Sequence, residues 1–300
     1  MTPVLFPMMF ENTSLIAVRV EARCETGRVI ETGTAFWFRA AADAPLYLVT
    51  NWHIVTGRSR LAPSMSLSAG VPTKLVARMH IQLGPDTINS KQIMQFEFPL
   101  NDPDGESPSW LEHPKWRHRA DVVALRVEWS PGDARPAFAC VGDKGVFDLT
   151  PGFVPRVTND VFLLGYPWGL TGGTAALPIY KRGSIATEPG LPQFDLPRFL
   201  IDCRTARGMS GAPVIASAFA QGPIGPDGEG GQGTAQVFAG IYSGRLPKEE
   251  IGGETLDSAS LRAEAEVAIS EIGIVWRRDV LHDIVSAGVP GSKVSELLNL

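Results

Sequence analysis

The sequence predicts an all-β protein made of two β units, followed by one short C-terminal helix. Three observations lead to this fold class. Short runs of β-branched, aromatic and aliphatic residues recur along the chain and are separated by turn residues. The 300 residues include 31 glycines and 24 prolines, which favours many turns and short strands. A hydrophobic content of 44% is enough to bury one large core or two medium ones.

Two series of strand-like segments divide the chain. The first series predicts strands over residues 15–20, 33–38, 46–50, 75–83, 92–98 and 121–127. A turn at Pro131-Gly132 follows, and the second series predicts strands over residues 160–166, 179–187, 198–203, 212–217 and 236–243. We therefore expect a first domain over residues 1–135 and a second over residues 136–300.

Two polar segments and one amphipathic segment complete the predicted fold. Residues 101–118 and 222–233 are rich in proline, glycine and charged residues, so both segments are expected to be mobile surface loops. Apolar residues recur at roughly helical spacing over residues 275–287, and Gly288 and Pro290 follow as stop signals. This spacing predicts the C-terminal helix.

Charge, hydropathy and cysteine content exclude several classes of protein. The net charge of −5 and the lack of a basic stripe argue against nucleic-acid binding. No apolar run is long enough to span a membrane, and residues 1–10 lack the basic start of a secretory signal. The three cysteines, Cys24, Cys140 and Cys203, are an odd number and cannot form a full disulfide framework. We expect free thiols, a cytoplasmic location and neither a nucleic-acid nor a membrane partner.

A histidine, an aspartate and a serine, each beside a hydrophobic run, suggest nucleophilic catalysis. A serine hydroxyl is a poor nucleophile at neutral pH, so it needs a base whose pKa lies near the working pH. That base needs an acceptor that fixes its tautomer. We expect Ser210 to be the nucleophile, His53 the base and Asp121 the acceptor. The backbone N–H groups of Gly208 and Ser210 are expected to form the oxyanion hole.

Other residues that could carry chemistry fit less well. Asp102 and Asp104 are rival acids, but both lie in turn-like sequence with no strand after them. The other histidines have no nucleophile motif beside them and are interpreted as structural: His80, His113, His118 and His282. Ala212 breaks the Gly-x-Ser-x-Gly pattern of the hydrolase elbow. Without His-Glu-x-x-His or Cys-x-x-Cys, the sequence predicts neither a metal site nor a cofactor.

Three short motifs resemble those of trypsin-like serine proteases. The sequences around the predicted triad, Thr50-Asn-Trp-His53, Asp121-Val-Val-Ala-Leu125 and Gly208-Met-Ser-Gly-Ala-Pro213, are similar to the catalytic motifs of that class. Leu163-Leu-Gly-Tyr-Pro-Trp-Gly-Leu170, and Asp202 with Arg207, are similar to its bacterial HtrA-type branch. Too few residues follow Arg245 for the PDZ domain of that branch, so a PDZ-less relative is expected. The resemblance implies two six-stranded antiparallel β-barrels packed at right angles, with the site in the cleft between them.

The same resemblance implies an activity and a set of substrate-binding residues. The activity is hydrolysis of protein or peptide substrates through an acyl-enzyme, without a cofactor. The alignment of motifs places five residues around the primary specificity pocket: Arg204, Thr205, Tyr242, Ser243 and Gly244. Ser243 and Gly244 would pair with the substrate backbone. If Arg204 faces the pocket, it would favour an acidic substrate residue; alternatively it pairs with Asp202 or lies in water.

A second class of function is compatible with the same sequence. The chain could be a protease-fold binding or scaffolding module, or a protease that is inactive until an activating protein partner reorders the loop around Met209. Met209 stands where activated trypsins have an aspartate that pairs with a newly formed amino terminus. A thioether cannot make that ion pair, so activation by simple propeptide removal is not expected.

Overall fold

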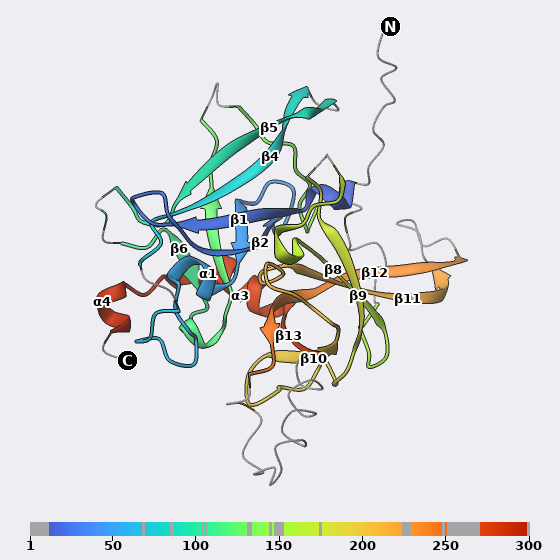
Figure 1. The fold of residues 1–300 in the computed structure, drawn as a ribbon. Helices are drawn as coiled ribbons and strands as arrows, with labels where there is room; N and C mark the ends of the chain where they lie inside the picture. Colours follow the sequence, from blue (N-terminus) through green and yellow to red (C-terminus); the bar gives the residue numbers. More distant parts are fainter. Residues whose placement is uncertain are drawn as a thin grey trace, which may run out of the picture.

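The computed structural model of the chain describes residues 12–67, 70–84, 87–103, 105, 107–130, 134–143, 146, 153–173, 176–223, 230–247, 250 and 271–298. Within these residues the fold is mostly β, with one eight-stranded sheet and one closed six-stranded barrel. Figure 1 shows the two units packed against each other, with β1 to β5 in the upper part and β8 to β13 below and to the right. The predicted all-β class with two units is confirmed.

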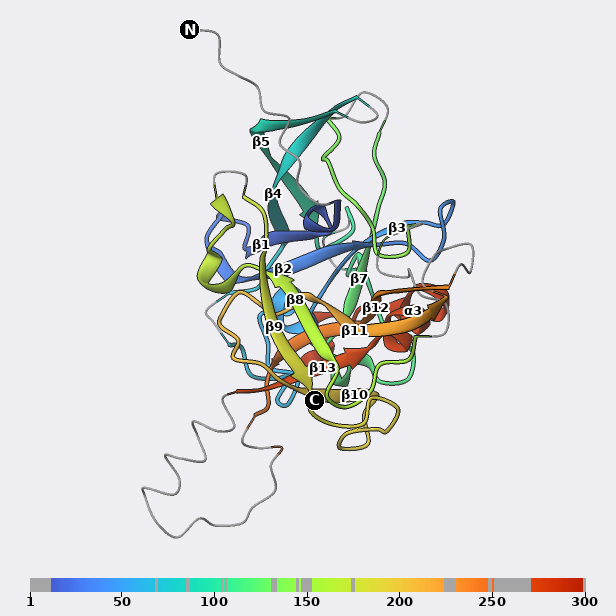
Figure 2. The ribbon, with the colours of Figure 1, turned by 90° about the vertical axis from the view of Figure 1, so that its right-hand side faces the viewer.

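The first unit contains strands from both ends of the chain. After the 3-10 helix η1 (Asn12–Leu15), its strands are β1 (Ala17–Arg23), β2 (Val29–Phe38), β3 (Leu46–Thr50), β4 (Lys74–Gly84), β5 (Thr87–Pro99), β6 (Trp110–Glu112), β7 (Val123–Val127) and β14 (Val289–Pro290). They lie in the order β14-β6-β7-β3-β2-β1-β4-β5. Figure 2 shows the β4–β5 hairpin projecting away from the second unit.

This first unit is an eight-stranded sheet rather than the expected closed six-stranded barrel. The short strands β6 and β14 extend one edge of the sheet. Beyond the opposite edge strand, β5, an isolated bridge joins Asn101 and Pro108. The Ser109 N–H donates to the Leu100 carbonyl at 3.0 Å, and the Asp102 N–H donates to the Ser107 carbonyl at 2.8 Å. These bonds lie outside β5 and β6, and within the described residues no ladder between the two strands closes the sheet.

Alternating burial in β1 illustrates why these segments form strands. Val18, Val20 and Ala22 are buried on one face of β1. Arg19 and Glu21 alternate with them and form an ion pair at 2.9 Å. This period of two matches the pleat of a strand with one buried face. A side chain such as Val20, at 0% exposure, contributes about 1.5–3 kcal/mol through burial.

The second unit is the closed six-stranded barrel that was expected. Its strands are β8 (Asp160–Gly165), β9 (Ile179–Ile185), β10 (Arg198–Asp202), β11 (Pro213–Pro223), β12 (Gly230–Arg245) and β13 (Ile272–Arg277). They close in the order β10-β13-β12-β11-β8-β9. A shared core cluster joins the two units, with Phe36 and Val49 of the first and Ile215 and Phe238 of the second.

Strand β13 and helix α3 (Arg278–Ala287) correct the C-terminal prediction. The helix is present, but it begins at Arg278 rather than at residue 275. Three consecutive residues of β13, Ile274, Val275 and Trp276, are all buried, because β13 has neighbours on both of its faces. Consecutive apolar residues of this kind do not separate a strand from a helix by their periodicity alone.

The two predicted loops contain regular structure. Residues 101–118 include β6 and most of the 3-10 helix η2 (Arg117–Arg119), and Trp110 and Glu112 are buried there. Of residues 222–233, the ends belong to β11 and β12. Residues 224–229 lie outside the described part of the chain. The polar composition of residues 101–118 therefore gave no sign of the short strand β6, which is buried through its pairing with β7 and β14.

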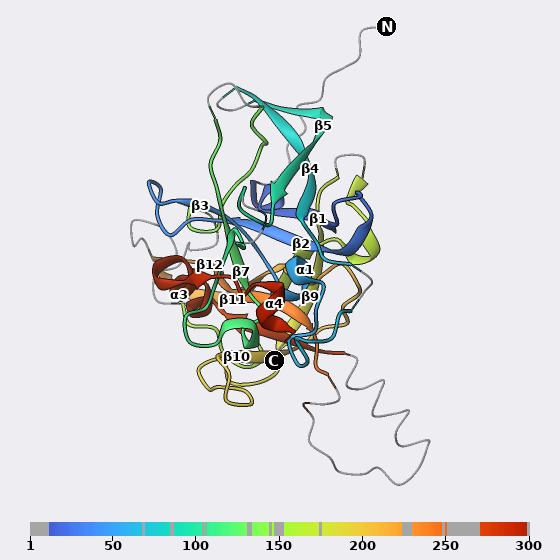
Figure 3. The ribbon, with the colours of Figure 1, turned by 90° about the vertical axis from the view of Figure 1, so that its left-hand side faces the viewer.

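The C-terminal segment returns to the first unit. β14 pairs with β6, and Leu297 of helix α4 (Val294–Leu297) is buried in the same core cluster as Trp52. Figures 1 and 3 show α4, in red, on the side of the first unit. The predicted boundary between residues 135 and 136 stays a prediction. No helix among the described residues has both the length and the apolar character needed to cross a membrane.

Candidate active site

His53 lies on a short helix that is anchored from behind. Helix α1 (Trp52–Thr56) follows β3 directly and ends at Gly57, whose φ of 65° is a left-handed conformation that suits glycine. The neighbouring Trp52 is fully buried, and its indole N–H donates to Oε1 of the buried Glu112 at 3.0 Å. These contacts fix the helix and leave His53 half-buried, with 18% of its side chain exposed.

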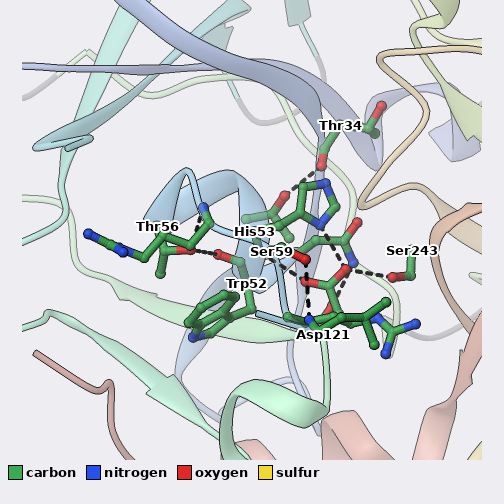
Figure 4. A network of polar contacts seen from close by, with 12 residues as sticks. Thr34, Trp52, His53, Thr56, Ser59, Asp121 and Ser243 are labelled. Carbon is green, nitrogen blue, oxygen red and sulfur yellow. Dashed lines mark hydrogen bonds and ion pairs between the residues drawn. The ribbon is translucent and has the colours of Figure 1, made fainter. Parts of the chain in front are cut away.

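The Asp121 carboxylate orients the His53 ring. Asp121 precedes β7, and its side chain is 2% exposed. Its Oδ2 lies 2.7 Å from His53 Nδ1, and its Oδ1 accepts the His53 backbone N–H at 2.9 Å. The Ser243 hydroxyl donates to Oδ2 at 2.5 Å. Figure 4 shows the carboxylate joined by dashed lines to both His53 and Ser243. With Nδ1–H directed at Asp121, the ring is in the tautomer that leaves Nε2 as the base.

The electrostatics of this pair favour an anionic carboxylate beside a basic imidazole. Burial lowers the pKa of His53, but the charge of Asp121 and its hydrogen bond outweigh burial, so the pKa is raised above its ordinary value of 6.5. Burial raises the pKa of Asp121, but the charge of His53 and the hydrogen bonds from His53 and Ser243 lower it below 3.8. Asp121 is therefore ionised at neutral pH.

Ser210 lies in a turn between β10 and β11 that is built around two glycines. Gly208 has a φ of 90° and Gly211 a φ of 87°. A Cβ atom at Gly208 would lie 2.3 Å from the Tyr166 carbonyl oxygen, and one at Gly211 would lie 2.0 Å from the Thr34 carbonyl oxygen. Only glycine fits at both positions, so the Gly-x-Ser-Gly sequence follows from the packing of this turn.

Thr34 of β2 holds the Ser210 turn from the opposite unit. Its backbone N–H donates to the Ser210 carbonyl at 2.8 Å, and its hydroxyl donates to the Gly208 carbonyl at 2.7 Å. The Thr34 hydroxyl also accepts the Tyr166 backbone N–H at 3.3 Å, and its carbonyl accepts the Thr50 hydroxyl at 2.8 Å. Thr34 is 0% exposed. One residue thus joins the turn to the strand that leads into α1.

The turn presents two backbone donors without a hydrogen-bond partner among the described residues. Neither the N–H of Gly208 nor that of Ser210 donates a hydrogen bond within the described part of the chain. The peptide group before Gly208 is fixed, because the Trp168 N–H of the 3-10 helix η3 (Pro167–Gly169) donates to the Arg207 carbonyl at 2.6 Å. Fixed and unpaired N–H groups are what a developing oxyanion requires.

Gly33 lies between α1 and the Ser210 turn. A Cβ atom at Gly33 would lie 2.8 Å from Ile54 Cδ1 and 3.0 Å from the Ser210 carbonyl oxygen. The residue after His53 and the backbone of Ser210 are therefore both within van der Waals range of one glycine. Among the described residues, no hydrogen bond joins the Ser210 hydroxyl to His53.

The residues predicted to bind substrate are in varied environments. Thr205 and Tyr242 are buried, and their hydroxyls bond to each other. Their part in substrate binding stays a prediction. Ser243 contacts Asp121, because β12 shifts its register between Tyr242 and Gly244. Gly244 is half-buried. Arg204 is exposed and makes no ion pair with Asp202 or any other described residue.

A cavity of about 620 Å³ lies beside His53 and Asp121. We call it the apolar cavity, after the six apolar residues in its lining: Leu61, Ala62, Met65, Leu67, Pro247 and Ile274. Its other lining residues are Ser59, Arg60, Ser66, Ser243, Gly244 and Arg245. The segment after α1 forms one wall, and sequence reasoning gave it no role. The Arg245 guanidinium donates to the Thr205 carbonyl at 2.6 Å on the β12 side.

The remaining sequence candidates have structural contacts. His113 lies 3.3 Å from Asp283, and the rings of His118 and His282 pack against Trp52 and Phe38. His80 is buried in β4. Asp102 accepts the Gly105 N–H in a turn, and Asp104 lies outside the described residues. Within the described chain, no group of three or more His, Cys, Asp or Glu side chains gathers at a metal-site spacing.

Comparison with known proteins finds distant structural neighbours. No model of a protein family matches the chain, and no curated protein matches it. The chain is similar to the crystal structure of the Rv3671c protease from M. tuberculosis in its active form, with 15% identity, 94% of this chain and 85% of that chain covered and a TM-score of 0.43. An inactive form of the Rv3671c protease matches with 16% identity, coverage of 91% and 89% and a TM-score of 0.41.

A third solved structure is the serine endoprotease from Yersinia pestis, with 11% identity, 98% of this chain and 68% of that chain covered and a TM-score of 0.45. By their names, these structural neighbours are a protease and a serine endoprotease. At such low identities and TM-scores the likeness is distant, and the function of this chain is inferred from its site residues.

Proposed function

We propose that the chain is a serine endopeptidase that hydrolyses peptide bonds through Ser210, His53 and Asp121. The observation that carries the proposal is the contact of 2.7 Å between His53 Nδ1 and Asp121 Oδ2. This contact selects the tautomer in which Nε2 accepts a proton. The second carboxylate oxygen accepts the His53 backbone N–H, so the residue that moves the proton is fixed at two atoms.

The reaction proceeds by two acyl transfers. His53 Nε2 takes the proton of the Ser210 hydroxyl as Oγ attacks the substrate carbonyl carbon, and the N–H groups of Gly208 and Ser210 donate to the oxyanion. The tetrahedral intermediate collapses, the C–N bond breaks, and His53 gives its proton to the leaving amine. Water then attacks the acyl-enzyme, His53 takes the proton of that water and returns it to Ser210 Oγ, and the carboxylate product leaves.

The proposal is tested by comparing cleavage with the serine present and absent. We expect the wild-type protein to cleave peptides from a denatured proteome and the Ser210→Ala variant to cleave none, as measured by mass spectrometry. Ser217→Ala, in β11 of the same barrel, is the matched control and should cleave normally. Circular dichroism checks that both variants are folded. Retained turnover by Ser210→Ala would overturn the assignment.

One observation favours a gated form of this function. The missing hydrogen bond between the Ser210 hydroxyl and His53 is compatible with a protease that an activating partner completes, or with a binding module. Catalytic hydrogen bonds often tighten only when substrate binds, so we prefer the protease. A protein that binds peptides but cleaves none in the assay above, with or without cell extract, would be a binding module.

From the free thiols of Cys24, Cys140 and Cys203, we also propose a cytoplasmic location.

A further inference from the structure

A second cavity adjoins the apolar cavity. Its volume is about 480 Å³, and Arg60 and Leu61 line both cavities. We call it the basic cavity, because most of its polar lining residues are cationic or imidazole groups. The lining is Arg60, Leu61, Pro63, His118, Arg119, Phe194, Leu196, Arg198 and Glu250. Two cavities that share a wall form one path that leads away from His53.

Arg198 is the most deeply buried charge in this path. Its side chain is 1% exposed, and its guanidinium lies 5.4 Å from the Phe194 ring centre and 5.5 Å from that of Trp276. Nε donates to the Gln193 carbonyl at 3.2 Å, and Nη2 pairs with Glu250. Nη1 is buried and has no hydrogen-bond partner among the residues that the structure describes. A buried guanidinium with one unsatisfied nitrogen is a costly arrangement that a second acceptor would relieve.

Positive charge exceeds negative charge around Arg198. Glu250 bridges Arg60 and Arg198 with its two carboxylate oxygens, and it is the one carboxylate among the described lining residues. Arg119 is exposed and makes no ion pair within the described chain. Burial lowers the pKa of Arg198, and the charges of Arg60 and Arg119 act in the same direction against Glu250. Three guanidinium groups therefore face a single carboxylate.

The apolar cavity differs from the basic cavity in its exposed apolar side chains. Leu61, Met65 and Leu67, on the segment after α1, are 44%, 65% and 54% exposed. Large apolar side chains exposed together beside a reactive group are typical of a surface that binds a partner. A ligand that covers them and also reaches Arg119 and Arg198 needs an apolar part followed by an anionic part.

We propose that the two cavities bind the peptide substrate, with an apolar side chain in the apolar cavity and an Asp or Glu side chain in the basic cavity. The substrate carboxylate would pair with Arg119 and supply the second acceptor that Arg198 lacks, after a small displacement of Glu250. This inference rests on the proposed function, because it names the substrate class of the same site. It also moves the predicted acidic preference away from the exposed Arg204.

Binding is tested first on the Ser210→Ala variant, where turnover cannot interfere. The probes are two synthetic peptides that differ only in Glu or Gln at the position that reaches the basic cavity, taken from the cleavage-site profile of the wild-type protein. If the wild-type protein cleaves nothing, the probes come from a positional scan of Leu-rich peptides. We expect the Glu peptide to bind at least about 10-fold more tightly by calorimetry, since one ion pair with a buried guanidinium is lost in the Gln peptide.

Two arginine variants test which residue produces the preference for the Glu peptide over the Gln peptide. Arg119→Ala, in the Ser210→Ala background, should reduce the Glu-over-Gln preference several-fold, because Arg119 is exposed and its loss leaves the fold intact. Arg204→Ala removes an exposed arginine near Ser210 that lines neither cavity, and it should leave the preference unchanged. In active protein, Arg119→Ala should raise KM for the Glu peptide without changing its kcat.

The outcomes separate this inference from the proposed function. Equal binding of the Glu and Gln peptides, or a preference that Arg204→Ala removes and Arg119→Ala does not, would overturn the inference while cleavage still supports the protease. Tight and selective binding of the Glu peptide without cleavage would support the two-cavity site and overturn the proposed reaction. Inorganic phosphate is the further probe. A protein that binds phosphate through Arg119 but does not distinguish the two peptides has a site for free anions, which would also overturn the inference.

Discussion

Replacing Thr34 by valine tests how the Ser210 turn is held. Valine has nearly the volume of threonine, but it removes the hydroxyl that donates to the Gly208 carbonyl at 2.7 Å and accepts the Tyr166 N–H at 3.3 Å. The bond from the residue 34 N–H to the Ser210 carbonyl is a main-chain bond, so it remains. The Gly208 carbonyl and the Tyr166 N–H lose a partner in a buried place, which costs about 1–3 kcal/mol for each such group.

Losing the Thr34 hydroxyl also loosens the main chain that orients the oxyanion donors. The peptide that carries the Gly208 carbonyl lies between the two proposed donors, the N–H groups of Gly208 and Ser210. Loss of one donor outright lowers kcat by about 100- to 1,000-fold. Thr34 acts on them through the main chain, so we expect Thr34→Val to lower kcat about 10- to 100-fold, with KM within about 3-fold of wild type. That loss corresponds to about 1.4–2.7 kcal/mol.

Steady-state kinetics and urea unfolding measure the two effects. Thr32→Val is the matched control: it makes the same substitution two residues earlier in β2, where the hydroxyl makes no hydrogen bond within the described residues. Thr34→Ser keeps a hydroxyl and should recover most of kcat. The reasoning is refuted if Thr34→Val has a wild-type kcat, or if Thr34→Ser is as slow as Thr34→Val.

Three further predictions concern the residues around His53 and Tyr242. Asp121→Asn should lower kcat by about 10,000-fold, because the amide no longer selects the tautomer with a basic Nε2, and a rate close to wild type would contradict this. In the wild-type protein, kcat/KM should fall as pH is lowered through the His53 pKa, since protonated imidazole cannot take a proton. Because Asp121 raises that pKa, the midpoint lies above 6.5, and a pH–rate profile with a midpoint well below 6.5 would refute the ion pair. Tyr242→Phe removes the hydroxyl that bonds to buried Thr205, so the free energy of unfolding should fall by about 1–2 kcal/mol in urea titrations; an unchanged value would show that this bond is not needed.

The strands near the site could be predicted because their apolar residues, recognisable in the sequence, are buried in the folded structure. β3 and β7 were expected over residues 46–50 and 121–127, and the structure has β3 at Leu46–Thr50 and β7 at Val123–Val127. Both are short apolar runs between turn residues. β6 was concealed, since its burial comes from β7 and from the distant strand β14.

The site was predictable only where a residue type carries its chemistry by itself. A histidine and an aspartate beside hydrophobic runs are recognisable, and His53 and Asp121 are in contact. Thr34 and Glu112 are ordinary residues in sequence, and their roles depend on contacts with Gly208 and Trp52, which are far away along the chain. The contact of Ser243 with Asp121 was not expected, because alignment does not show the bulge in β12 that turns this side chain toward Asp121. Pairing of Ser243 with the substrate backbone stays a prediction.

The cluster of positive charges in the basic cavity could not be predicted from the sequence either. Sequence alone indicated an acidic preference through Arg204, which lies six residues before Ser210 in the chain. The fold leaves Arg204 in solvent and brings together Arg60, Arg119 and Arg198 from three separate segments. Each of the three is unremarkable in its own segment. Their charges come together only when the fold brings segments of both units side by side.

Labelling with a fluorophosphonate probe tests the central claim most directly, because the probe reacts only with an activated serine. Intact-mass and peptide mass spectrometry should show one adduct, on Ser210, in the native wild-type protein. The adduct should be absent after denaturation and strongly reduced in His53→Ala. Native, folded protein that cleaves peptides but stays unlabelled at Ser210 would contradict the proposed triad.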